Sequence, residues 1–333
     1  MVATIVGSRL GVQQTSAFVL GSRGQIGNAS LGRGGENVFV NGVTGNLVVT
    51  NQDEFLVGLG PDAAINRSYN SQGDVAGETD NWMVNIRRVQ SLNGAVNTAG
   101  SYLFRRDWDG SLVAYQYDTT RGLYVSKEGS GADDTLTLVS DPAQGGVSAW
   151  KWQDGDTGLT EYYDAAHNNL IHRAVDRDGN AVTYAYNTNN TISRITTQDG
   201  SYTDFTWNGS GNLTSLTSRW YDAQTSAWKV QTRTRYAYDA QNRLTSVTVD
   251  LTPNDQVVAD GKTYVTTYTY DGTSTRVNSI TQTDGSRIDI TYEISGAYRV
   301  TSITQSVAQG VSRDRKSVAK GKRVDRGGRR SMN

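Results

Sequence analysis

Residues 236–250, YAYDAQNRLTSVTVD, carry the pattern that decides the fold of this chain. Tyr236 and Tyr238 stand two apart, Asp239 follows at once, and Leu244 opens an apolar run five residues after the aspartate. Side chains two apart lie on the same face of a strand. An aspartate can bond the backbone two residues further on and so begin a turn. The stretch therefore predicts a strand, a turn and a returning strand, which together form a β-hairpin.

The same pattern recurs along the chain in register with Asp-Gly pairs. Two aromatic or large apolar residues stand five and seven positions after the glycine, an acidic or amide residue follows, and an aliphatic comes five later. The base period is about 22 residues, with two insertions of about ten. Because one hairpin cannot bury its aromatic face alone, we expect neighbouring hairpins to stack around a shared core. The predicted core aromatics are Tyr115, Tyr117, Tyr184, Tyr186, Phe205, Trp207, Tyr236, Tyr238, Tyr268, Tyr270 and Tyr292.

Two local details refine the hairpin prediction. Asp-Gly between alternating runs favours a two-residue loop of type I′, in which both central residues have φ > 0. Leu244 and Val247 are three apart, which breaks strict alternation. A β-bulge at the start of the return strand would explain that spacing.

The composition agrees with an all-β chain of ordinary size. Among 333 residues there are 18 Tyr, 7 Trp and 36 Gly but only 3 Pro. The sequence contains no cysteine, which excludes disulfides and thiol chemistry. The sequence contains no run of 18 apolar residues, so no membrane helix is predicted. The N-terminal residues lack the features of a cleaved signal peptide. We divide the chain into an irregular Gly/Ser-rich extension (1–35), a leader β region (36–105), the hairpin array (106–311) and a tail (312–333).

The tail carries a charge unlike that of the rest of the chain. Residues 314–333 hold eight Lys or Arg against two Asp; without them, 24 positive and 31 negative side chains give a formal charge of −7. A basic arm for nucleic acid is one interpretation. The segment also resembles a translated sequencing adapter, so we exclude it from fold reasoning, expect it to be disordered, and expect the natural protein to continue beyond about residue 309. The acidic body opposes nucleic-acid binding.

Four segments carry a resemblance to a known family. RYAYDAQNRLTSVTVD (235–250) and YTYDGTSTRVNSITQTDG (268–285) resemble the tyrosine-aspartate step of RHS/YD-repeat proteins. VTGNLVVTNQDEF (43–55) and DAAINRSYNSQGD (62–74) resemble the segment that precedes the repeats in that family. The resemblance covers roughly residues 36–311, and it depends on six or seven copies in register after the leader.

The resemblance implies a fold and a role. Family members are large bacterial secreted or surface proteins whose antiparallel hairpins form a spiralling, shell-like open sheet, often around a C-terminal toxin domain. We therefore expect a structural shell fragment, with the remainder of the same polypeptide as its partner. The family's proline-rich signature and a toxin domain are missing from the sequence, so an effector would lie outside it. Other members are linked to carbohydrate binding or cell-surface contact, which stays an alternative.

The polar motifs give little support to catalysis. His167 and His172 are five apart and point to opposite faces of an extended chain, so we expect no metal site and no cofactor. Paired aspartates abut glycines and are explained by turns, although a weak Ca²⁺ loop at 154–158 or 176–180 stays open. A glycosidase pair of carboxylates would require a cleft. We expect no enzyme.

Two tryptophans are the candidates for surface recognition. Trp220 and Trp228 stand off the repeat register at the insertion 222–231. We expect them to be the most exposed aromatics and, in the alternative function, to contact a cell-surface glycan. A truncated array would also leave an open sheet edge, which predicts self-association.

Overall fold

The computed structural model describes eight segments, namely 4–6, 30–31, 36–73, 80–126, 133–255, 257–294, 296–306 and 315–317. Nearly all regular structure in them is β, as predicted. Single 3₁₀ turns occur at Pro142–Gln144, Ala165–His167 and Val258–Asp260. No helix in these segments has the length and apolarity to span a membrane.

A small sheet, here called the inner sheet, is built from the N-terminal part of the chain. Its order is β1-β3-β4-β5-β6, with β2 on β3. β1 runs parallel to β3, and the other pairs are antiparallel. The strands are β1 (Thr4–Val6), β2 (Ser30–Leu31), β3 (Glu36–Asn41), β4 (Leu47–Leu56), β5 (Ala63–Asn70) and β6 (Trp82–Val84). Two short strands thus lie within 1–35, whose other residues are outside the described segments.

The main sheet takes the rest of the chain as consecutive antiparallel strands. Its first part comprises β7 (Arg88–Asn93), β8 (Tyr102–Arg106), β9 (Leu112–Asp118), β10 (Leu123–Ser126), β11 (Thr135–Asp141), β12 (Val147–Gln153), β13 (Thr160–Asp164) and β14 (Leu170–Val175). Then follow β15 (Ala181–Tyr186), β16 (Ile192–Thr196), β17 (Tyr202–Trp207), β18 (Leu213–Asp222), β19 (Ala227–Tyr238), β20 (Leu244–Asp250), β21 (Thr263–Tyr270), β22 (Val277–Gln282), β23 (Arg287–Tyr292) and β24 (Val300–Ser306).

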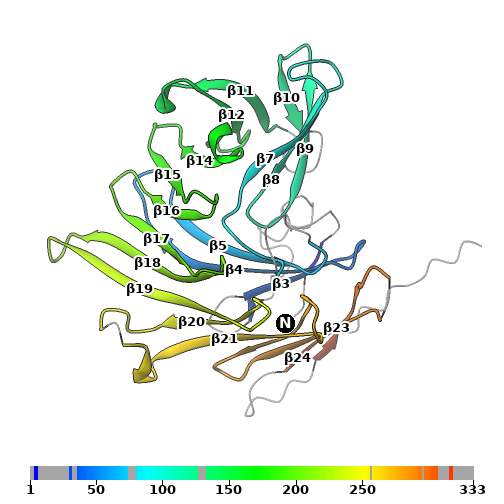
Figure 1. Cartoon of the computed structure of the whole chain (residues 1–333), viewed down its shortest axis with the longest axis vertical. Helices are drawn as coiled ribbons and strands as arrows, with labels where there is room; N and C mark the ends of the chain where they lie inside the picture. The colour runs from blue at the N-terminus through cyan, green and yellow to red at the C-terminus, as the bar shows by residue number, and fades with distance from the viewer. Residues whose placement is uncertain are drawn as a thin grey trace, which may run out of the picture.

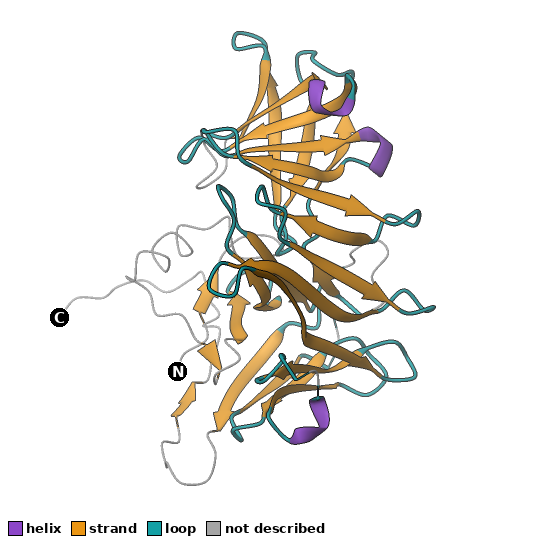
Figure 2. Cartoon of the chain, turned by 90° about the vertical axis from the view of Figure 1, so that its left-hand side faces the viewer, coloured by secondary structure: helices purple, strands orange, loops and turns teal. Residues whose placement is uncertain are grey.

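One end of the main sheet curls into a barrel. β14 pairs with β7 through Leu170 and Arg88, which closes the strands β7–β14 (Figure 1). β14 also pairs with β15, so the sheet continues beyond the closure to β24. Figure 2 shows the strands stacked along the long axis of the molecule. A three-residue strand in the tail, β25 (Arg315–Ser317), adds to β24 where disorder was expected; the rest of the tail is outside the described segments.

Two apolar cores follow from this arrangement. One fills the barrel and contains Leu103, Tyr115, Trp150 and Tyr163. The other lies between the inner sheet, which contributes residues such as Ile65, and strands β15–β24, which contribute residues such as Ile280. The leader is therefore an inner layer covered by the repeats. β7 and β8, which lie within 36–105, pair in the main sheet.

The Asp-Gly turns differ from the predicted type. At 197–201, Thr197 N–H donates to Ser201 O (2.8 Å) and Gly200 N–H donates to Thr197 O (3.0 Å). Only the glycine has positive φ, at 85°, so the loop has three residues and the prediction of a two-residue I′ turn is wrong. The same bonding recurs at 107–111, 176–180 and 282–286. A three-residue loop requires positive φ at only one residue. The glycine takes that position, and the aspartate before it keeps a negative φ.

The predicted bulge is confirmed. Tyr238 pairs with Leu244 while Ala237 pairs with Ser246, so Thr245 is the extra residue. This explains why Leu244 and Val247, three apart, both face the core. The same register shift occurs beside Tyr163, Tyr186, Trp207, Tyr270 and Tyr292.

Candidate functional site

In four hairpins, the second aromatic bonds the hairpin before it. Tyr270 Oη donates to Leu244 O at 2.7 Å, and Tyr292 Oη donates to Val277 O at 2.8 Å. Trp207 Nε1 makes the same bond to Ile192 O at 2.7 Å. Tyr186 bonds Ile171 O in the same way, at 2.5 Å. Each acceptor lies at the start of the return strand, as its first residue (Ile192, Leu244, Val277) or its second (Ile171), next to the bulge that interrupts the ladder. We call this bond the inter-hairpin tie.

The first aromatics of two hairpins reach instead into the inner sheet, where a charged cluster surrounds Arg67. Arg67 is 1% exposed, and its guanidinium bonds Asp53 (2.8 Å) and Glu36 (2.9 Å). Tyr236 Oη donates to Asp53 Oδ2 at 2.6 Å. Tyr268 Oη donates to Glu36 Oε1 at 2.5 Å and accepts from Arg67 Nη1 at 2.9 Å. We call these five residues the Arg67 cluster; it joins β3, β4 and β5 to β19 and β21.

Burial sets the electrostatics of the Arg67 cluster. Burial raises the pKa of Glu36, and the neighbouring Arg67 charge and Tyr268 hydroxyl only partly oppose it. For Arg67, burial acts to lower the pKa, but Asp53, Tyr268 and Glu36 raise it above its ordinary value. Arg67 is therefore held charged. Its ring contact with Trp82, 4.7 Å from guanidinium carbon to ring centroid, completes the enclosure.

The barrel contains a second cluster of the same kind. Arg105 Nη2 bonds Glu161 at 2.6 Å, Nε bonds Tyr163 Oη at 2.8 Å, and the guanidinium lies 3.9 Å from the Trp152 ring centroid. Arg87 bonds the other Glu161 oxygen at 2.9 Å. Each core thus centres on an arginine whose acidic and tyrosine partners come from other strands. Neither Arg67 nor Arg105 was predicted from the sequence as a core residue, although Arg67 stands within the leader segment 62–74.

The predicted core aromatics lie on the core side of the sheet to different depths. Tyr115, Phe205, Tyr236, Tyr268 and Tyr270 are buried. The first aromatic Tyr184 and most of the second aromatics are half-buried. Tyr184, Tyr186, Trp207, Tyr238 and Tyr292 pack against the larger core, and Tyr117 packs against the barrel core.

The two tryptophans at the insertion have different environments. Trp228 is 41% exposed and meets Tyr221, 49% exposed, edge to face at 5.7 Å between centroids. Trp220 is half-buried and packs against the larger core. The expectation that it would be among the most exposed aromatics is therefore wrong. Alternation explains the difference, since Trp220 falls on the inward face and Tyr221 on the outward face. Tyr221, which was not predicted from the sequence, is the second exposed aromatic here.

The histidines and turn aspartates are engaged within the fold. His167 Nδ1 lies 2.8 Å from Asp164, and His172 Nε2 lies 2.8 Å from Asp141, on separate partners. In the loop 176–180, Asp176 accepts bonds from the backbone of Asp178 and from Asn180, the chemistry of a turn. Within the described segments, no group of three or more His, Cys, Asp or Glu side chains is placed to hold a metal.

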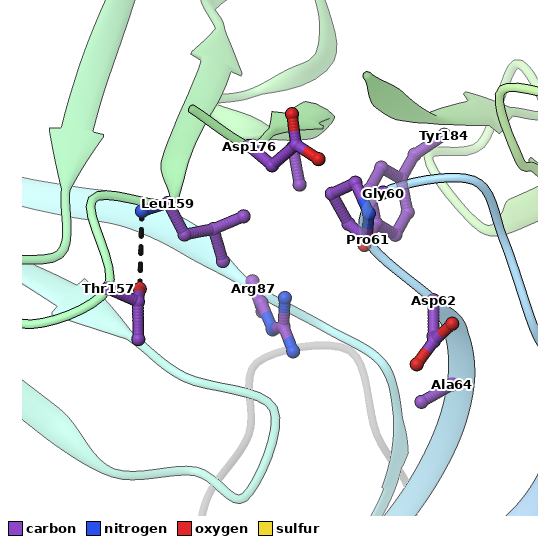
Figure 3. Close-up of a pocket in the computed structure, with 10 residues that line it drawn as sticks. Gly60, Pro61, Asp62, Ala64, Arg87, Thr157, Leu159, Asp176 and Tyr184 are labelled. Atoms are coloured by element: carbon purple, nitrogen blue, oxygen red, sulfur yellow. Dashed lines mark hydrogen bonds between the residues drawn. The ribbon is translucent and has the colours of Figure 1, made fainter. Parts of the chain in front are cut away.

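An open pocket of about 400 Å³ lies where the β4–β5 loop meets the barrel (Figure 3). Gly60, Pro61 and Asp62 of the β4–β5 loop line it together with Arg87, Tyr184 and Asp176. Arg87 already forms an ion pair with Glu161, and Asp176 already accepts a hydrogen bond from the backbone N–H of Asn180 in its own turn. The pocket therefore offers a ligand few unmatched polar groups.

Comparisons with known proteins give only distant similarity. No protein-family model matches the chain, and no curated protein matches it. Among solved structures, the TcdB2-TccC3-Cdc42 complex aligns at 11% identity with a TM-score of 0.30, over 85% of this chain and 19% of that one. The Photorhabdus luminescens Tc holotoxin pore aligns at 9% identity with a TM-score of 0.29, over 85% and 18%. The chain spans about a fifth of the length of these proteins, and similarity at this level carries no function across.

Proposed function

We propose that the chain is a structural, shell-forming segment of an RHS/YD-repeat protein. Its sheet would enclose or present an effector domain carried elsewhere in the same polypeptide, in a secreted or surface-exposed bacterial protein. The observation that carries the proposal is the inter-hairpin tie. It recurs at Tyr186, Trp207, Tyr270 and Tyr292, each time between one hairpin and the one before it.

The chemistry of the repeat agrees with an architectural role. A tyrosine supplies both the apolar ring for the core and the hydroxyl that reaches the carbonyl beside the bulge. The aspartate after it starts the turn: Asp239 Oδ1 accepts from the backbone N–H groups of Gln241 and Arg243, both at 2.9 Å. At Tyr270-Asp271, the Tyr-Asp step thus leads into the turn of one hairpin and attaches that hairpin to its neighbour.

The carboxylates also favour a scaffold over an enzyme. Asp53 and Glu36 are buried in the Arg67 cluster, and turn aspartates such as Asp154 accept backbone N–H bonds. A glycosidase requires two carboxylates facing a substrate. We propose that the chain has no catalytic activity, and reproducible hydrolysis of a glycoside by the purified chain would count against this.

Amide hydrogen exchange under native conditions tests whether the inner sheet and the main sheet open as one cooperative unit. The inner sheet and strands β15–β24 share a core, so we expect their slowest amides to exchange with the same free energy of opening. If the amides of β3–β5 exchanged through a separate, lower-energy opening, the inner sheet would be an independent unit and the proposal would fail.

A further inference from the structure

Four bulged hairpins of the main sheet donate a backbone N–H to the leader. In each hairpin the donor is the residue that pairs with the aromatic beside the bulge. The bonds run from Ile171 N to Arg87 O (3.1 Å), from Leu244 N to Asp80 Oδ2 (2.9 Å), from Val277 N to Tyr69 Oη (3.0 Å) and from Val300 N to Gly45 O (3.0 Å). We call these four bonds the leader bonds.

The leader bonds follow one order along the chain. Their donors advance through the repeats from Ile171 to Val300. Their acceptors go back through the leader from Arg87 to Gly45. Later hairpins therefore bond earlier positions of the leader, so the leader runs along the hairpin array in the opposite direction. This regular order is the property of a track and not of scattered contacts.

The bulge makes these N–H groups dependent on a partner outside their own hairpin. A bulge interrupts the ladder of backbone bonds, and a buried N–H without an acceptor is costly. Leu244 and Val277 are 1% and 0% exposed, so water does not supply that acceptor. On the other side of the same two residues, the carbonyls accept the inter-hairpin ties of Tyr270 and Tyr292. The leader thus bonds the N–H of a return strand, and the following hairpin bonds its C=O.

The leader bond at β22 also reports the register of its hairpin. Tyr69 Oη accepts from Val277 N–H and donates to Thr275 O at 2.9 Å, so one hydroxyl bonds two positions of one hairpin. A slip of one residue would break both bonds and turn every side chain of the strand to the other face. The leader bond therefore discriminates the native register from its neighbours.

The sequence separations favour a leader that forms first. Strands β3–β5 pair with their neighbours in sequence, and such local contacts form early. Formed alone, the bond between Tyr69 and Val277 closes a loop of 208 residues. With Asp80 and Leu244 already bonded, the free chain is 33 residues on the repeat side and 11 on the leader side. A loop of about 44 residues closes roughly tenfold more readily than one of 208. Docking in chain order is therefore the fast route.

We propose that the leader is an internal folding template for the repeats. It forms first, and the bulged hairpins dock on it in chain order from β14 to β24. The leader bonds select the register of each hairpin, and the inter-hairpin ties then join the hairpins to one another. This function concerns how the main sheet forms, and it does not depend on what that sheet encloses.

Two variants of the full chain test the proposal on the two sides of one residue. Tyr69→Phe removes the leader bond to Val277 N–H, and Tyr292→Phe removes the tie to Val277 O, while both keep their rings. Stopped-flow refolding and unfolding in urea, followed by tryptophan fluorescence, give the two rates. Tyr69→Phe should slow refolding at least about fivefold and change unfolding less than about twofold, because its bonds are already present in the transition state. Tyr292→Phe should instead speed unfolding at least about threefold and leave refolding within about twofold.

The opposite result would overturn the proposal. If Tyr292→Phe slowed refolding and Tyr69→Phe only accelerated unfolding, the repeats would assemble first and the leader would join them later. Wild-type rates in Tyr69→Phe would equally refute a template role. Pulsed hydrogen exchange during refolding of the unsubstituted chain checks the same order. Amides of β3–β5 should gain protection before those of β20–β24, and simultaneous or later protection of β3–β5 would contradict the proposal.

Discussion

Replacing Tyr270 with phenylalanine removes one inter-hairpin tie while keeping the ring. Tyr270 is 8% exposed; its hydroxyl donates to Leu244 O at 2.7 Å and accepts from Trp82 Nε1 at 3.1 Å. The variant leaves a buried carbonyl and a buried indole N–H without that partner. Each unsatisfied buried group costs about 1–3 kcal/mol, so we expect Tyr270→Phe to lower the free energy of unfolding by about 2–6 kcal/mol.

Equilibrium urea unfolding at neutral pH, followed by tryptophan fluorescence, measures this loss. The matched control is Tyr221→Phe, which removes a hydroxyl from a ring that is 49% exposed and should change the free energy of unfolding by less than about 0.5 kcal/mol. The slope of the free energy against urea should be the same in all three proteins, since the same surface is exposed on unfolding. If Tyr270→Phe were as stable as its control, the tie would contribute nothing and the reasoning would be refuted.

Three further outcomes are expected. Arg67→Met should destabilise the chain by about 3–5 kcal/mol in the same assay, because Asp53 and Glu36 stay buried without their cation; a loss below about 1 kcal/mol would contradict this. Burial raises the pKa of Asp80 to about 6 from 3.8, so the folded state binds this proton more tightly, and Asp80 makes stability fall as pH rises from about 4 to about 6. The stability difference between Asp80→Asn and wild type should therefore change across pH 4–6, and a constant difference would speak against it. Gly110→Ala should destabilise more than Gly179→Ala, because both glycines have positive φ but only the new methyl at 110 meets neighbours, Asn70 at 2.8 Å and Met83 at 2.9 Å; equal thermal midpoints would argue against turn docking on the inner sheet.

The hairpins could be predicted from the sequence because their signals are local. Tyr236, Tyr238, Asp239 and Leu244 lie within nine residues, and the three-residue step to Val247 indicated the bulge. The turn type was wrong because Asp-Gly fits both a two-residue and a three-residue loop, and the choice depends on the pairing of the flanking strands.

Features that join distant segments could not be predicted in this way. The barrel closes through Leu170 and Arg88, 82 positions apart, and no residue pattern marks that contact. The Arg67 cluster likewise combines three strands of the leader with two of the repeats. The expected exposure of Trp220 was wrong. Trp220 does not fit the repeat pattern, which suggested exposure, but strand alternation directs its side chain toward the core.

A double-mutant cycle across the two sheets tests most directly whether repeats and leader form one structural unit. Tyr236→Phe removes the hydroxyl on β19, Asp53→Asn removes the acceptor charge on β4, and the double variant removes both; urea unfolding gives each free energy. Residues bonded in one network show interaction energies of about 0.5–3 kcal/mol. We expect a coupling of at least about 1 kcal/mol. Additive effects, within about 0.3–0.5 kcal/mol, would show that the two sheets do not stabilise each other through this bond.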